Sequence, residues 1–145
     1  MSKSNAFENA LLLLAFNNTN IANVGDATGL RGSTTAGSLY LSLHTADPGE
    51  AGSQTTSEAA YTSYARVAVA RSGAGFTVTG NSVSPAATVS FPAGTGGTGT
   101  ATHFGIGTDS SGAGTLLYSG TVTPNIVMGN GITPQLTTAT AVTED

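Results

Sequence analysis

The sequence predicts a mainly β fold, an antiparallel β-sandwich or jelly roll with one N-terminal helix. Three observations predict it. One apolar segment near the start has helical spacing, and about seven short segments with alternating apolar residues follow it. Gly, Pro and Asn separate those segments at short intervals. The third observation is the abundance of Thr, whose branched side chain suits a pleated strand.

The first predicted element is a helical segment over residues 1–18. Ser4 or Asn5 can cap its start, and Glu8 stands three residues after Asn5, where a capping-box acid belongs. Its wide apolar surface includes Phe7, Leu11, Leu12, Leu14 and Phe16. Such a helix must be buried, and the periodicity leaves open whether its own domain or a partner's groove buries it.

The remaining elements are a loop or arm over residues 19–38, rich in Gly, Thr and Asn, and a β-sandwich over residues 39–145. We expect these parts to form a single domain overall, because a chain of 145 residues suits one core. The predicted strands, in order, are 39–43, 64–71, 76–79 with a hairpin partner from residue 83, 87–91, 101–106, 115–122, 126–128 and 132–142.

The composition indicates a protein that packs against other proteins. Only 8% of the residues are charged, against about a quarter in ordinary soluble domains. Few charges leave a surface prone to association, which predicts contacts with copies of the chain or with another protein.

Several partner classes are not expected. The four basic residues are too few and too dispersed to follow a phosphate backbone, so nucleic acid is not an expected partner. The longest apolar run, residues 10–16, is shorter than the roughly 20 residues of a membrane span. The asparagines after it do not resemble a cleavage site, so we expect neither a membrane partner nor a signal peptide. The absence of Cys excludes disulfides and thiolate sites.

The glycines Gly94, Gly96 and Gly99 match the spacing of a dinucleotide-binding motif. That motif requires a helix immediately after it, whereas a strand-like segment follows here, so we predict a loop. The two histidines, His44 and His103, have no ligand set around them and are predicted to be hydrogen-bonded structural residues.

The loop carboxylates Asp47, Glu50 and Glu58 are the remaining candidates for chemistry. Folding could cluster them for acid–base work or for calcium, but their spacing matches no known calcium loop. We therefore predict no catalytic residues, no metal site and no cofactor.

Five stretches of the chain carry a family resemblance: LYLSLHTADP (39–48), YARVAV (64–69), VSFP (89–92), THFGI (102–106) and GTLLYSGT (114–121). In this order, after an apolar helix, they resemble a family of small virion proteins of tailed bacteriophages. Members of that family are labelled tail-fibre-like, capsid decoration or structural proteins. The loop 20–38 departs from the tighter connection expected for such proteins.

The resemblance implies a non-enzymatic particle component assembled in the cytoplasm of a bacterial host. The main expectation is a capsid decoration or cement protein on the outer capsid surface, bound to the major capsid protein and to copies of itself as a trimer or dimer. The alternative is a tail-fibre or tail-tip component, with polar loops at 49–60 and 107–114 contacting the host surface. The candidate interface residues are Phe7, Leu11, Leu12, Leu14, Phe16 and Arg31.

Overall fold

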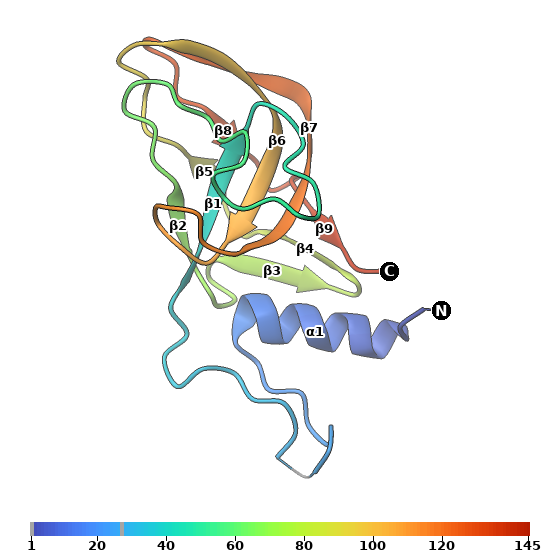
Figure 1. The fold of residues 1–145 in the computed structure, drawn as a ribbon. Coiled ribbons are helices and arrows are strands. Elements are labelled where there is room, and N and C mark those ends of the chain that lie inside the picture. Colours follow the sequence, from blue (N-terminus) through green and yellow to red (C-terminus); the bar gives the residue numbers. More distant parts are fainter. Residues whose placement is uncertain (1, 27) are drawn as a thin grey trace. The chain divides into compact units, whose positions relative to one another are not determined.

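A computed structural model describes residues 2–26 and 28–145. The described chain is mainly β, with antiparallel sheets and one N-terminal helix, which confirms the predicted fold class (Figure 1). The elements are α1 (Asn5–Asn17), β1 (Ser38–His44), β2 (Val67–Ala70), β3 (Phe76–Thr79), β4 (Ser82–Pro85), β5 (Val89–Ser90), β6 (Thr98–Gly107), β7 (Leu116–Gly129), β8 (Gln135–Leu136) and β9 (Val142–Thr143). No helix among these residues is both long enough and apolar enough to span a membrane.

The chain forms two compact units. The first unit comprises Met1–Ser38, Val69–Ala87 and Thr137–Asp145, and the second comprises Leu39–Ala68 and Thr88–Leu136. The sequence-based organisation, a helical segment 1–18, an arm 19–38 and a sandwich 39–145 in a single domain, stays a prediction.

Helix α1 has well-formed caps at both ends. The Ser4 side chain accepts a hydrogen bond from the Phe7 N–H at 3.4 Å, as an N-cap residue does. Asn18 ends the helix in the left-handed conformation, with φ 56°. The Arg71 guanidinium donates to the carbonyls of Leu14 and Ala15, each at 2.6 Å. A cation at this end favours the helix dipole and satisfies carbonyls that have no partner inside the helix.

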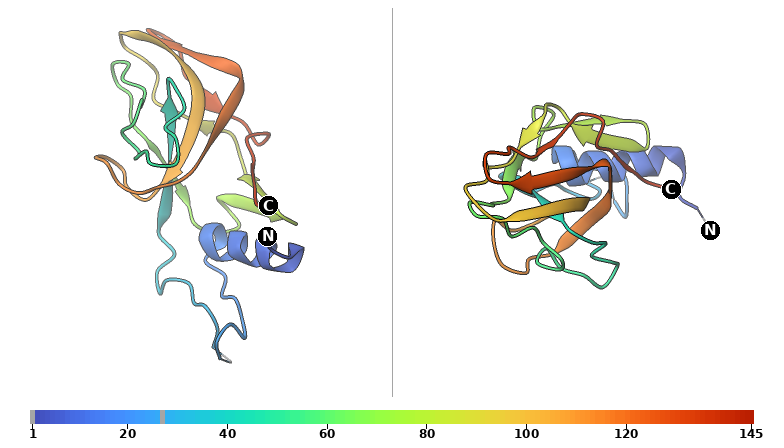
Figure 2. Two further views of the ribbon diagram at one scale, coloured as in Figure 1. Left: turned by 45° about the vertical axis from the view of Figure 1, so that its right-hand side comes forward. Right: turned by 90° about the horizontal axis from the view of Figure 1, so that it is seen from above.

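In the first unit, α1 packs against the three-stranded sheet β3-β4-β9, and Figure 2 shows the helix running alongside β3. Leu12 and Phe16, one turn apart on the packed face, are fully buried. The Phe16 ring meets Phe76 of β3 edge to face, with ring centroids 5.0 Å apart. Val83 of β4 pairs with Val142 of β9, so the last strand completes this small core.

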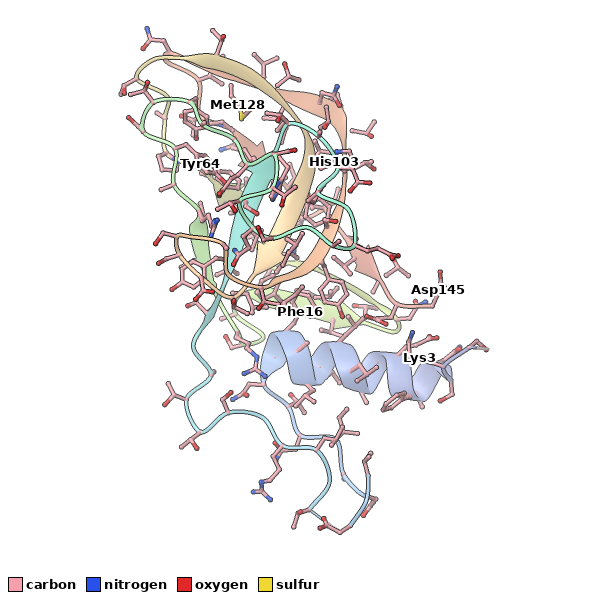
Figure 3. The ribbon with its side chains drawn as sticks, in the orientation of Figure 1. Lys3, Phe16, Tyr64, His103, Met128 and Asp145 are labelled. Carbon is pink, nitrogen blue, oxygen red and sulfur yellow. The ribbon has the colours of Figure 1, made fainter. Side chains whose placement is uncertain are left out.

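The segment after α1 has an irregular backbone. Its described residues form no regular helix or strand beyond a bridge between Ile21 and Leu30. Asn18 fixes the base of the arm, because its amide donates to the Ser33 carbonyl at 2.8 Å and accepts from the Ser33 N–H at 2.7 Å. Lys3 and the last residues of the chain lie together in the same unit, where Lys3 pairs with Glu144 at 3.2 Å (Figure 3).

The second unit contains β1 from Leu39 onward, β6, β7, the first two residues of β2 and the short pair β5-β8. The larger sheet has the strand order β2-β1-β6-β7. Strand β1 lies inside the larger sheet and is buried on both faces at its end. Leu41 and Leu43 belong to the apolar core, whereas Ser42 and His44 lie on the opposite face and are also fully buried. A polar sheet face can be buried only if its groups find hydrogen-bond partners, and the loop after β1 supplies one of them.

Several predicted strand boundaries were wrong, and the largest differences lie at three places. The two strands predicted over 115–122 and 126–128 form one strand, β7, which runs from Leu116 to Gly129 through Pro124. Proline is tolerated there because β7 is the edge strand of its sheet, where one side of the backbone has no ladder partner. Strand β6 starts at Thr98, inside the expected glycine loop, and the predicted strand 132–142 contains only two short strands, β8 and the start of β9.

Candidate functional site

An ion pair between buried Arg66 and half-buried Glu58 connects two loops of the second unit. Arg66 binds the Glu58 carboxylate through two nitrogens, with Nε–Oε1 at 2.7 Å and Nη2–Oε2 at 2.8 Å. The same guanidinium donates to the backbone carbonyls of Asp109 and Gly112. Tyr64 donates to Glu58 at 3.0 Å, and burial raises the pKa of its hydroxyl. We call Glu58, Tyr64 and Arg66 the Arg66 triad.

Gln54 also connects the loop after β1 with the turn between β6 and β7. Its side-chain nitrogen donates to the Asp109 carbonyl at 3.2 Å, and its oxygen accepts from the Asp109 N–H at 2.9 Å. Gln54 is fully buried, although it lies outside any strand. The loop after β1 and the turn between β6 and β7 are therefore held together by paired hydrogen bonds within one unit.

Ser42 and His44 have the geometry of a nucleophile and its base, with Oγ and Nε2 2.8 Å apart. His44 Nδ1 lies 2.8 Å from the Thr56 carbonyl and must donate to it, which leaves Nε2 to accept from the serine. Both side chains are fully buried, so no substrate can reach them. The strand opposite carries Gly105, where a Cβ would lie 2.6 Å from both polar atoms. The pair is structural, as the sequence predicted for His44.

This buried histidine predicts a pH-dependent stability. Burial lowers the pKa of His44 below its ordinary 6.5, and Arg66 and His103 act in the same direction, against the Thr56 carbonyl and Glu58. The unfolded chain therefore binds more protons between that lowered pKa and 6.5, so His44's contribution is complete above about pH 6.5 and declines as the pH falls through this window. Melting temperatures should decrease between pH 7.5 and 5.5, and His44→Gln should flatten that dependence. An unchanged slope in the variant would contradict the assignment.

The second unit also has an open hollow of about 450 Å³ on the β6–β7 face. Its lining includes His103 of β6 and the exposed Ser119 and Thr121 of β7, and the loop after β1 contributes a wall with Asp47 and Glu50. The antiparallel register pairs His103 with Thr121, which places both side chains on one face of the sheet. Other lining residues are Gly49, Gly52, Leu116, Leu117, Tyr118 and Gly120. We call this site the β6–β7 hollow.

The sequence did not predict that Asp47, Glu50 and His103 line the same hollow. Asp47 and Glu50 were considered with Glu58 as one carboxylate cluster, but Glu58 binds Arg66 and the other two line the β6–β7 hollow. His103 was assigned a structural role, and its Nδ1 does lie 2.9 Å from the Thr102 hydroxyl. Its place in the hollow was missed. The alternation of His103 with buried Phe104 was the only available signal that it faces away from the core.

The two remaining candidates are the glycine motif at residues 94–99 and a metal-binding cluster. The glycines from Gly94 to Gly99 lead into strand β6, so no helix N-terminus follows them to hold a pyrophosphate. Within the described residues, no group of three or more His, Cys, Asp or Glu side chains is placed to hold a metal ion.

The structure divides the predicted interface residues by burial. Leu12 and Phe16 are core residues of the first unit. Phe7 is 38% exposed, and Leu11 and Leu14 are half-buried. Positions 7, 11 and 14 share one helix face by their spacing, distinct from the packed face. Arg31 is exposed in the arm. The docking role of these residues stays a prediction, and the helix face with Phe7, Leu11 and Leu14 is less buried than the packed face with Leu12 and Phe16.

Comparison with known families identifies the chain. A family model described as podophage GP4 fiber I protein gp80 matches residues 2–143. The chain belongs to this family. The match confirms the resemblance to tailed-phage virion proteins and identifies a phage virion fibre protein family. No curated protein matches the chain.

Membership of a fibre protein family favours a structural, non-enzymatic role. The inaccessible Ser42–His44 pair is consistent with that role, because it cannot act on a substrate. The family name agrees better with the predicted fibre alternative than with the predicted capsid decoration.

Proposed function

We propose that this protein is a structural component of a phage tail fibre that contacts the host cell surface. The family match over residues 2–143 is the observation that carries the proposal. The low charge supports it, because 8% charged residues suit a chain packed against other subunits. The second unit supports it as well, because a surface that contacts a host needs loops held in place.

Those loops are held by the Arg66 triad and Gln54. Arg66 and Gln54 both bind the backbone of the β6–β7 turn, and Thr45 and Ala59 close the base of the loop after β1 through backbone hydrogen bonds. Rigid loops lose little conformational entropy on contact, which favours binding. The β6–β7 hollow lies beside the loop after β1 and is the concave surface we assign to host contact.

Self-association belongs to the same proposal. The face of α1 formed by Phe7, Leu11 and Leu14, with Leu30 of the arm exposed in the same unit, offers apolar surface for neighbouring fibre subunits. The partners of the protein and its copy number can be measured on the assembled virion, so the proposal is tested there.

The test locates the protein on purified virions. Gold-labelled antibodies against the chain should bind the tail, and quantitative mass spectrometry should give far fewer copies than the major capsid protein. Labelling spread over the head, with a copy number comparable to capsid protein, would establish the capsid-decoration function instead. Antibodies against the major capsid protein provide the control for head labelling.

A further inference from the structure

We propose that the β6–β7 hollow binds a neutral or amino-bearing saccharide of the bacterial surface. The inference rests on the proposed host contact and names its ligand class. The hollow has a volume of about 450 Å³, within the range of roughly 300–1,000 Å³ that small-molecule sites occupy. Its lining belongs entirely to the second unit, so one compact body contains the whole site.

The charges of the hollow select the class of sugar. Asp47 and Glu50 supply two carboxylates, and the lining contains no Lys or Arg. Carboxylates accept strong hydrogen bonds from hydroxyl or ammonium groups, and they repel phosphates and sugar acids. The lining adds the exposed residues Ser119 and Thr121, whose hydroxyls both donate and accept, and a half-buried imidazole on His103. This set fits a ligand covered with hydroxyls and without negative charge.

Apolar surface lies beside these polar groups. Leu117 is 42% exposed at the rim, and Leu116 lies next to it in the lining. Sugars present C–H faces as well as hydroxyls, and the C–H faces gain from contact with aliphatic side chains. The polar side chains of the lining can fix the orientation of a ligand whose C–H face contacts the two leucines.

The wall of the hollow is shaped before any ligand arrives. Asp47 Oδ1 accepts from the Gly49 N–H at 2.9 Å, which fixes the carboxylate at the turn. Gly49 has φ +69°, a conformation that favours glycine, and Gly52 donates back to the Gly49 carbonyl at 3.1 Å. Gln54 then ties the end of this loop to Asp109. A preformed wall reduces the entropy lost on binding.

The test uses the full-length chain on an array of bacterial surface polysaccharides that includes neutral, amino-sugar and acidic glycans. The wild-type protein should bind neutral or amino-sugar glycans and not acidic ones. Ser119→Trp places an indole in the hollow and should abolish binding. Glu50→Gln removes one charged acceptor and should weaken binding about tenfold. Thr100→Trp is the matched control, because Thr100 is exposed on β6 outside the lining, and it should bind like wild type.

Three results would overturn the inference: no binding to any neutral or amino-sugar glycan, a preference for acidic glycans, or binding that Ser119→Trp and Glu50→Gln both leave intact. Melting curves establish that each variant is folded, and Glu50→Gln keeps the test decisive if the tryptophan variant does not fold. Virion labelling answers the separate question of location. A tail location without glycan binding rejects the saccharide site alone, whereas a head location with glycan binding rejects the fibre function alone.

Discussion

Replacing Arg66 by methionine is expected to lower the free energy of unfolding by about 3–5 kcal/mol. The Arg66 side chain is only 2% exposed, and its partner Glu58 is 15% exposed. The substitution leaves the carboxylate partly buried without a cation, and it removes the donors of the Asp109 and Gly112 carbonyls. Each buried group without a partner adds its own desolvation cost. Such a loss is a large fraction of the stability of an ordinary domain.

The measurement is urea unfolding followed by circular dichroism, since the chain has no Trp. Arg31→Met is the matched control, because Arg31 is exposed in the arm, and it should change stability by about 0.5 kcal/mol or less. The double variant Arg66→Met/Glu58→Gln should recover part of the loss, because it removes the unpaired charge. If Arg66→Met lowered the free energy of unfolding by less than about 1 kcal/mol, the triad would not be a main contributor to stability.

The second large effect is expected in α1. Phe16→Ala should cost about 3–5 kcal/mol, because it removes a fully buried ring and leaves a cavity against Phe76. Phe7→Ala on the same helix should cost about 1 kcal/mol or less, because Phe7 is 38% exposed. Hydrogen exchange of the β3 and β4 amides measures the first unit directly, which matters if the two units do not unfold together.

This comparison separates the two roles that the sequence left open for the helix. Equal costs for the two phenylalanines would contradict the assignment of a packed face and an accessible face. Normal stability combined with poor incorporation of Phe7→Ala into virions would assign the accessible face to assembly. Deleting residues 1–18 cannot make this distinction, because the deletion also removes Leu12 and Phe16 from the core of the first unit.

The fold class was predictable because it depends on the number and type of helices and strands, which local sequence patterns indicate. The caps of α1 and the alternation in β1 depend on neighbours in sequence, and both were placed within a residue or two. Strand β7 was not predictable as one element, since the tolerance for Pro124 depends on the strand lying at a sheet edge. Edge position is set by the order of strands in space, which no local pattern encodes.

The site was less predictable than the fold. Arg66 stood out as a charge within an apolar segment, but its carbonyl partners lie more than forty residues away, at Asp109 and Gly112. The β6–β7 hollow combines residues near Asp47 with residues near Thr121, which only the pairing of β1, β6 and β7 brings together. Asp47 and Glu50 are exposed loop residues, and the sequence alone did not show that they line a hollow beside β6 and β7.

The interleaving of the two units has a consequence for synthesis on the ribosome. The second unit is complete once Leu136 has left the exit tunnel, whereas the first unit still lacks β9 and its Val142. The unit that contains the N-terminal helix therefore finishes folding last, although its first residues are translated first. Until then, the apolar face of α1 with Leu12 and Phe16 has an incomplete sheet to pack against, which makes the nascent chain a candidate for chaperone binding at that face.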